Sequence, residues 1–161
     1  MTELPELTFY DRARGWPVDR MSVGIWCRDL DRSLAFYRDG IGLSVISRNE
    51  FEADMDALFD APSQRLRSVF LGDRRRPDAG TVELVHLDEA PDDVPERRPA
   101  PGVLFVAFMV DVAAAVARLE QLGMARDLRR IEVPVGNIAT VVDPDGVRVE
   151  LIDTEPSPDP V

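Results

Sequence analysis

The sequence predicts an α+β fold made of two tandem βαβββ modules. Two stretches, VGIWCRDLDRSLAFYRDGIGL (23–43) and VAFMVDVAAAVARLEQLGM (106–124), follow the same order: an apolar strand, an acidic residue, an apolar helix face and a closing glycine. Three further strand-like segments follow each stretch, which is the pattern of an internal duplication. The 161 residues are enough for one domain with its own core.

The first half begins with a buried strand, Met21–Arg28, that ends at a charged residue. Asp29 is a good N-cap for a helix that is expected to run to about Asp39 and to end at Gly40. A second strand, a short helix and two strands joined by the hairpin GDRRRPDAG are then expected at Leu43–Arg48, Glu52–Phe59, Arg65–Leu71 and Thr81–Leu87.

The second half repeats this order. A strand over Val103–Val110 leads to a helix over Val112–Leu122, which Gly123 ends. A weaker strand near Leu128–Val133 precedes a hairpin of Ile138–Val142 and Val147–Asp153 around the turn DPDG. The residues expected to face inward from the helix are Ala113, Val116, Ala117 and Leu119.

Composition marks the segments outside the modules. Residues 1–20 read as an N-terminal arm, and residues 154–161 as a flexible tail rich in proline and acid. Between the first module (21–87) and the second (103–153), residues 88–102 form a linker whose prolines and acids resist both helix and central strand. All of this describes one domain.

The charge balance disfavours a nucleic-acid partner, because 30 acidic residues face 19 basic ones, all of them arginine, for a net charge of -11. No apolar run is long enough for a membrane helix, and the N-terminus lacks the pattern of a signal peptide, so a cytoplasmic protein is expected. A single cysteine, Cys27, excludes an internal disulfide. A single histidine, His86, excludes a site built from two histidines of one chain.

The duplication resembles the vicinal oxygen chelate superfamily, which includes glyoxalases, bleomycin-resistance proteins and dioxygenases. The resemblance covers about residues 21–153 and is carried by VGIWCRDLDRSLAFYRDGIGL, TVELVHL, LFVAFMVDVAAAVARLEQLG and DPDGVRVELID. It implies that the two modules form an open, curled sheet around a cleft, and that metalloenzyme members place one metal ligand on each of four strands.

Carried over residue by residue, those four positions are Ser22, Glu83, Phe105 and Glu150. Both positions where the family usually has histidine lack one, and phenylalanine cannot ligate a metal. The resemblance therefore implies no tight zinc or iron site here, and at most a weakly held divalent cation at the two glutamates.

If the strands alternate as expected, Val82, Leu84 and His86 face the helix, and Glu83 and Glu150 face the cleft. The same parity makes Cys27 a buried structural thiol. Candidate substrate-binding residues on the cleft wall are Ser22, Trp26, Phe105, Met109 and Arg148. The alternative is that Trp26, Phe105 and Met109 simply fill a collapsed core.

Three functions fit these residues. In the first, the cleft binds a small apolar or aromatic molecule, and Glu83 and Glu150 act as a metal-independent acid–base pair in an isomerase, epimerase or cyclase. In the second, the acidic cleft binds a cationic aromatic antibiotic without chemistry, with Trp26 as a stacking surface. In the third, Glu83 and Glu150 hold a divalent metal ion in a lyase or dioxygenase. A homodimer is expected, since eight strands in a short chain leave open sheet edges.

Overall fold

The computed structural model describes residues 21–52, 54–61, 63–76, 79–89, 101–133 and 136–154. The predicted N-terminal arm, most of the linker and nearly all of the tail lie outside the described residues.

Each module contains one longer helix and four strands, as predicted. In the first module, the helix α1 continues directly into a π-helical segment, η2, and a short helix α2 lies between two strands. Its elements are β1 (Ser22–Trp26), α1 (Leu30–Leu34), η2 (Ala35–Ile41), β2 (Ser44–Glu52), α2 (Met55–Phe59), β3 (Arg65–Gly72) and β4 (Thr81–Leu87). The second module consists of β5 (Val106–Met109), α3 (Val112–Gln121), β6 (Arg126–Val133), β7 (Gly136–Val142) and β8 (Arg148–Thr154).

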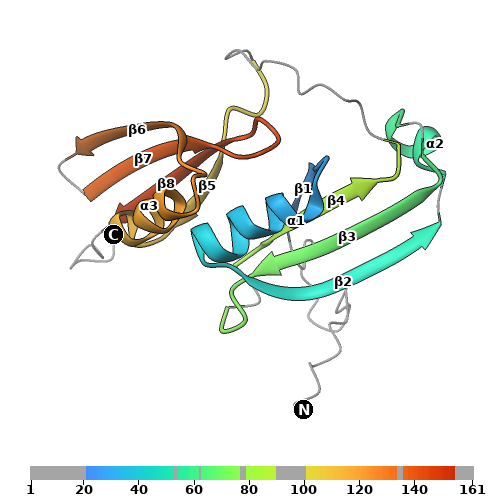
Figure 1. The fold of residues 1–161 in the computed structure, drawn as a ribbon, viewed down its shortest axis with the longest axis horizontal. Helices are drawn as coiled ribbons and strands as arrows, with labels where there is room; N and C mark the ends of the chain where they lie inside the picture. The colour runs from blue at the N-terminus through green and yellow to red at the C-terminus, as the bar shows by residue number, and fades with distance from the viewer. Residues whose placement is uncertain are drawn as a thin grey trace, which may run out of the picture.

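The two modules have the same sheet topology, which confirms the predicted duplication. The strand orders are β1-β4-β3-β2 and β5-β8-β7-β6, and in each sheet the first strand pairs in parallel with the last. Figure 1 shows the two sheets as separate halves, with the helices α1 and α3 near each other where the halves meet. The equivalence extends to single residues, because Glu83 lies opposite Gly24 and Glu150 lies opposite Ala107.

One apolar core joins the two modules. The alternation of each strand sends Val82 and Leu84 of β4, and Val149 and Leu151 of β8, into this core. Each sheet therefore has a helix-facing face inside the core and an opposite face that α1 and α3 do not cover, which we call the helix-free face. On the first sheet, Met55 of the short helix α2 packs on one end of this face, against Leu66 and Leu87. The helices supply Leu34, Phe36, Tyr37, Ile41, Val112, Ala115, Val116 and Leu119 to the same core.

The first helix ends later than predicted. It passes through Gly40 and ends at Gly42, which adopts the left-handed conformation with φ of 101°. Gly40 has a packing role instead: a Cβ there would lie 2.3 Å from Cδ2 of Leu119 on α3. The glycine at the predicted end thus permits close contact between the helices, and the next glycine provides the turn.

Two further predictions in the second half are corrected. Strand β5 is shorter than 103–110, because pairing with β8 begins only at Val106, opposite Val149. On α3, the residues Ala113 and Ala117 are exposed, so the prediction that they face inward is wrong. The buried stripe of this helix is Val112, Ala115, Val116 and Leu119, with the regular spacing of one helix face.

Candidate functional site

The predicted glutamates occupy equivalent places on the two helix-free faces. Glu83 is half-buried on β4, between Gly24 of β1 and Phe70 of β3. Glu150 is half-buried on β8, between Ala107 of β5 and Thr140 of β7. Because their chain neighbours point into the core, both carboxylates lie on the helix-free side of their sheets.

The surroundings of Glu83 are open and largely apolar. No atom lies within 4 Å of where a Cβ on Gly24 would be, so there is space beside the carboxylate. One residue pair further along the same face, Trp26 lies opposite Val85, and this residue is 40% exposed. Within the part of the chain that the structure describes, no hydrogen bond or ion pair joins the Glu83 carboxylate to another residue. This carboxylate is therefore available to a ligand.

The surroundings of Glu150 are aliphatic. On the same face, one residue pair further along, four aliphatic side chains follow one another across all four strands of the sheet. They are Met109, Ile152, Ile138 and Ile131. Among the described residues, the Glu150 carboxylate too has no hydrogen-bond or ion-pair partner.

Arg148, a candidate substrate-binding residue, is directed at the carboxylate of Asp127. Its guanidinium forms an ion pair with the carboxylate of Asp127, and Nη1 also donates to the Asp127 carbonyl at 3.2 Å. The hydrogen bonds that Asp127 accepts from Arg148 and Arg129 lower the pKa of its carboxyl group. Arg148 is thereby held in place two residues from Glu150.

The other predicted binding residues lie at the surface rather than in the core. Ser22 is exposed at the start of β1, and Phe105, which precedes β5, is 42% exposed. Met109 is 69% exposed. Together with the exposure of Trp26, this excludes the alternative in which Trp26, Phe105 and Met109 fill a collapsed core.

The residues at the four ligand positions do not fit a tight transition-metal site. Two carboxylates, one hydroxyl and one phenyl ring occupy them, and neither zinc nor iron is held by such a set. Over the described ranges, no group of three or more His, Cys, Asp or Glu side chains is placed to hold a metal ion.

A buried polar network, which the sequence did not predict, joins the modules. The turn between β7 and β8, predicted only as a turn, packs against α1. The Tyr37 hydroxyl donates to Oδ2 of Asp143 at 2.7 Å, and the Ser33 hydroxyl donates to Oδ2 of Asp145 at 2.5 Å. Backbone N–H groups of Asp145 and Val147 donate to Oδ1 of Asp143. Two acids in a turn are usually exposed, so no sequence signal distinguished this pair.

Burial shifts the pKa values of several groups in this network. Desolvation raises the pKa of Asp143, and desolvation followed by the nearby Asp143 charge raises the pKa of Tyr37. Burial also raises the pKa of the Cys27 thiol to about 12, and its Sγ donates to the Val85 carbonyl at 3.3 Å. The predicted buried structural thiol is confirmed. His86 is half-buried with Nδ1 3.1 Å from the Cys27 carbonyl oxygen.

This fold and these motifs define a class of proteins. Residues 20–151 match the model of the Glyoxalase/Bleomycin resistance protein/Dioxygenase superfamily, and the chain belongs to this family. The resemblance inferred from the motifs is thus confirmed.

Two curated relatives are named as lyases. The chain is 34% identical to the lactoylglutathione lyase-like protein terB of Aspergillus terreus over 135 residues, covering 76% of this chain and 68% of terB. It is 29% identical to lactoylglutathione lyase of Schizosaccharomyces pombe over 136 residues, covering 78% of this chain but only 44% of the yeast protein.

Solved structures share the fold. A glyoxalase family protein from Bacillus cereus superposes with a TM-score of 0.70 at 22% identity, covering 86% of this chain and 96% of the other. The trypanothione-dependent glyoxalase I of Leishmania major superposes with a TM-score of 0.54 at 27% identity, covering 83% and 84% of the two chains.

None of the helices in the described ranges is long and apolar enough to span a bilayer.

Proposed function

We propose that this protein binds a small apolar or aromatic molecule on its helix-free faces, and that Glu83 and Glu150 transfer protons to and from it without a tightly held metal. The observation that carries the proposal is the pair of equivalent, half-buried carboxylates that have no partner among the described residues. A buried or half-buried acid without a partner is costly to keep unless function needs it.

The proposed chemistry is an isomerisation, epimerisation or cyclisation. The two glutamates lie on different sheets of one chain, and in the homodimer proposed below we place the first sheet of one protomer against the second sheet of its partner, so that one glutamate of each kind reaches the same substrate. One glutamate, ionised, removes a proton from a carbon or hydroxyl of the substrate, and the other, protonated, donates a proton elsewhere on the same molecule. The proton count of the substrate is then unchanged. The small residues beside the glutamates, Gly24 and Ala107, leave room for the substrate, and Trp26 offers a ring on which it can stack.

A second candidate function is the binding of a cationic aromatic antibiotic without chemistry. The partly exposed Trp26 ring, one residue pair from Glu83, favours it, because a carboxylate and an indole together attract an aromatic cation. The lyase names of the two curated relatives favour the enzyme. Formation of product separates the two functions.

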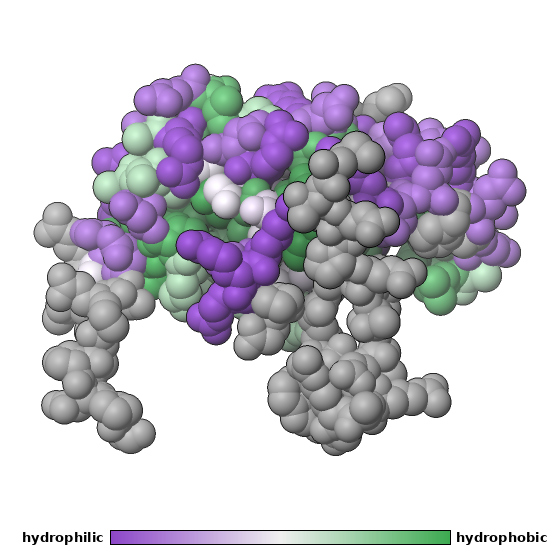
Figure 2. All heavy atoms as spheres, turned by 90° about the horizontal axis from the view of Figure 1, so that it is seen from below, coloured by the Kyte–Doolittle hydropathy of each residue, from purple (hydrophilic) through white to green (hydrophobic). Residues whose placement is uncertain are grey.

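The proposal includes a homodimer in the cytoplasm. The aliphatic row on the second sheet ends at Ile131, which is 59% exposed on the edge strand β6. Figure 2 shows apolar surface between hydrophilic rims on the side that it displays. An exposed aliphatic row and open sheet edges are stabilised by association with a second copy. The single thiol of Cys27, buried and unpaired, suits a reducing compartment.

The test measures proton transfer directly. The protein is incubated in D₂O with benzoin, an aromatic ketone with an acidic C–H bond, and NMR follows exchange of that hydrogen for deuterium. We expect Glu83→Gln and Glu150→Gln each to slow exchange on the order of tenfold or more, the scale of a lost general acid or base. Their melting temperatures should be equal to or above that of the wild type, because an unpaired carboxylate contributes no stabilising contact.

Glu52→Gln is the matched control, since Glu52 is an exposed glutamate on strand β2. This variant should exchange the benzoin hydrogen at the rate of the wild type. Exchange by the wild type should also persist in EDTA, because the proposed chemistry needs no tightly held metal. If both variants unfold readily and still bind the ketone as the wild type does, the glutamates are structural and the proposal is wrong.

A further inference from the structure

A pocket of about 470 Å³ lies where the two modules meet. We call it the junction pocket. Neither Glu83 nor Glu150 lines it, so it is distinct from the proposed catalytic faces. Its walls come from α1, from the segment joining α3 to β6 and from the β7–β8 turn. The lining residues are Arg32, Glu120, Gly123, Met124, Ala125, Arg126, Val142, Asp143 and Pro144.

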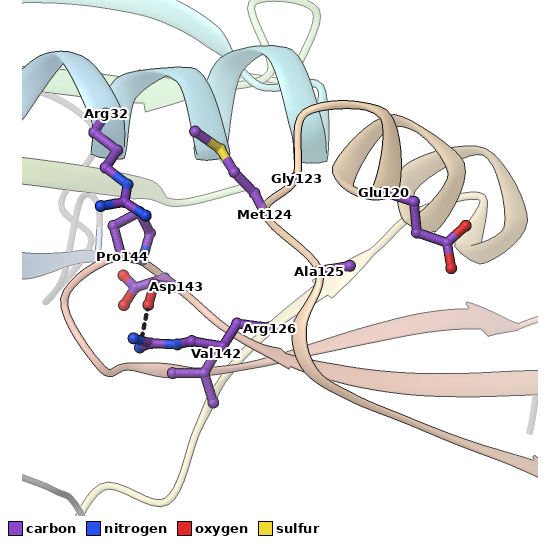
Figure 3. A pocket seen from close by; sticks show the side chains of 9 residues that line it. All are labelled: Arg32, Glu120, Gly123, Met124, Ala125, Arg126, Val142, Asp143 and Pro144. Carbon is purple, nitrogen blue, oxygen red and sulfur yellow. Dashed lines mark hydrogen bonds between the residues drawn. The ribbon is translucent and has the colours of Figure 1, made fainter.

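Two guanidinium groups converge on one side of the junction pocket. Figure 3 shows the side chains of Arg32 and Arg126, from different modules, both directed toward Asp143 and Pro144. Nη2 of Arg126 donates to the backbone carbonyl of Asp143 at 2.7 Å, which leaves its other N–H groups available. The side chain of Arg32 has no hydrogen bond or ion pair with any residue that the structure describes.

The acids that line the pocket are already engaged. The Asp143 carboxylate accepts from the Tyr37 hydroxyl and from two backbone N–H groups. Glu120 points away from the two arginines in Figure 3 and forms an ion pair with Arg130 at 3.3 Å. Neither acid therefore neutralises Arg32 or Arg126 by an ion pair.

Several other arginines in the described part of the chain have an acidic partner. Carboxylates lie within ion-pair distance of Arg38, Arg65, Arg67, Arg75, Arg129, Arg130 and Arg148. In a chain with 30 acidic residues and 19 arginines, partners are abundant. Arg32 and Arg126 face one pocket and form no ion pair with its carboxylates, so they are suited to an anion from outside.

The rest of the pocket wall is apolar. Met124, Ala125, Val142 and Pro144 are half-buried and give the pocket a lining without charge. The planar guanidinium group binds carboxylate and phosphate groups through paired N–H donors. We propose that the junction pocket binds a small organic anion, with its oxyanion between Arg32 and Arg126 and its apolar part on Met124, Val142 and Pro144.

Such a ligand contacts both modules at once. It joins α1 of the first module to the β7–β8 turn of the second, next to the buried Tyr37–Asp143 contact. Because it binds only when the modules are docked, it stabilises the folded protein by mass action.

The experiment uses three probes with one ring in common: benzoate, phenyl phosphate and neutral benzamide. Calorimetric titration and thermal unfolding of the full chain are measured with each. We expect at least one anion to bind and to raise the melting temperature, and benzamide to do neither. Arg32→Gln should weaken anion binding by about tenfold or more, as expected for a lost charge-assisted hydrogen bond.

Arg38→Gln is the matched control. Arg38 is an exposed arginine of the following segment, paired with Asp39, and its loss should leave anion binding unchanged. We choose Arg32→Gln rather than Arg126→Gln because Arg126 also donates a hydrogen bond to the β7–β8 turn, and its loss could disturb that turn.

Three results would overturn the proposal: no binding of either anion at millimolar concentration, equal binding of benzamide, or unchanged anion affinity in Arg32→Gln. Anion binding that is lost in Glu83→Gln or Glu150→Gln would also overturn it, because the ligand would then sit at the catalytic faces. Failure of the exchange assay with benzoin leaves this result unaffected, so the two proposals are tested separately.

Discussion

The carboxyl group of Asp143 is fully buried where the β7–β8 turn meets α1. Burial raises its pKa above the ordinary value of 3.8, although the Tyr37 hydroxyl and two N–H groups oppose the shift. The folded protein therefore keeps this proton to a higher pH than the unfolded chain does. Its contribution to stability is greatest below pH 3.8 and falls as the pH rises through the raised pKa.

Asp143→Asn tests this linkage. Asparagine keeps the shape, can still accept from the two N–H groups and can donate to the Tyr37 oxygen, but it does not titrate. Urea unfolding between pH 3 and pH 7 should show the stability of the wild type falling relative to the variant, by about 1.4 kcal/mol for each unit of raised pKa. If the difference in the free energy of unfolding between the two proteins does not vary with pH, the raised pKa of Asp143 is wrong.

Asp127→Asn is the control, because the pKa of Asp127 is lowered by Arg148 and Arg129. The pH dependence of its contribution to stability has the opposite sign. The stability that Asp127 contributes is present above pH 3.8 and is lost as the pH falls through the lowered pKa.

Among the elements, η2 and α3 pack closely against each other at Gly40. A Cβ on Gly40 would lie 2.3 Å from Cδ2 and 3.1 Å from Cγ of Leu119, which is itself fully buried. Leu119 cannot turn away into solvent, so its neighbours would have to shift. Glycine has a low helix propensity, but at this position it permits close contact between the two modules.

Gly40→Ala should destabilise the protein by about 1–2 kcal/mol. Overpacking of a dense core costs about 1–3 kcal/mol, and the helix propensity of alanine recovers up to about 1 kcal/mol. Urea unfolding measures the difference, and adding Leu119→Val should restore part of the loss, since the two sites are in contact.

Gly24→Ala is the matched control. No atom lies within 4 Å of its Cβ position, and the equivalent residue of the second module is already alanine, Ala107. Its effect should stay within about 0.5 kcal/mol. A Gly40→Ala protein as stable as the wild type would show that the helices can move apart at little cost.

For the whole molecule, the exposed aliphatic row on the second sheet bears on assembly. It runs from Met109 to the edge residue Ile131 across all four strands. We expect sedimentation at micromolar concentration to give the mass of two chains, because monomers seldom expose such rows. Ile131→Arg should shift the mass toward one chain, while Leu122→Arg, an equally apolar exposed position outside the row, should not. A wild-type mass of one chain would exclude the dimer.

Much of the fold follows from local pattern. The strands Arg65–Gly72 and Thr81–Leu87, and the helix that begins at Val112, lie within one residue of their predicted bounds. Asp29, the predicted N-cap, accepts from a backbone N–H group of the first helical turn, and Asp111, the acid at the equivalent place in the second half, does the same for α3. The period-two alternation around Glu83 and Glu150 also holds.

The duplication, the family and the strand faces of the two glutamates follow from the sequence alone, because they depend on periodicity and on residues near in the chain. Only the tertiary structure showed that Gly40 packs against Leu119, that Arg148 binds Asp127 and that Tyr37 meets Asp143. These contacts join residues brought together by the docking of elements distant in the chain or by a β-bulge. No local pattern encodes which partner a buried polar group will meet, since that partner is chosen by packing of the whole chain.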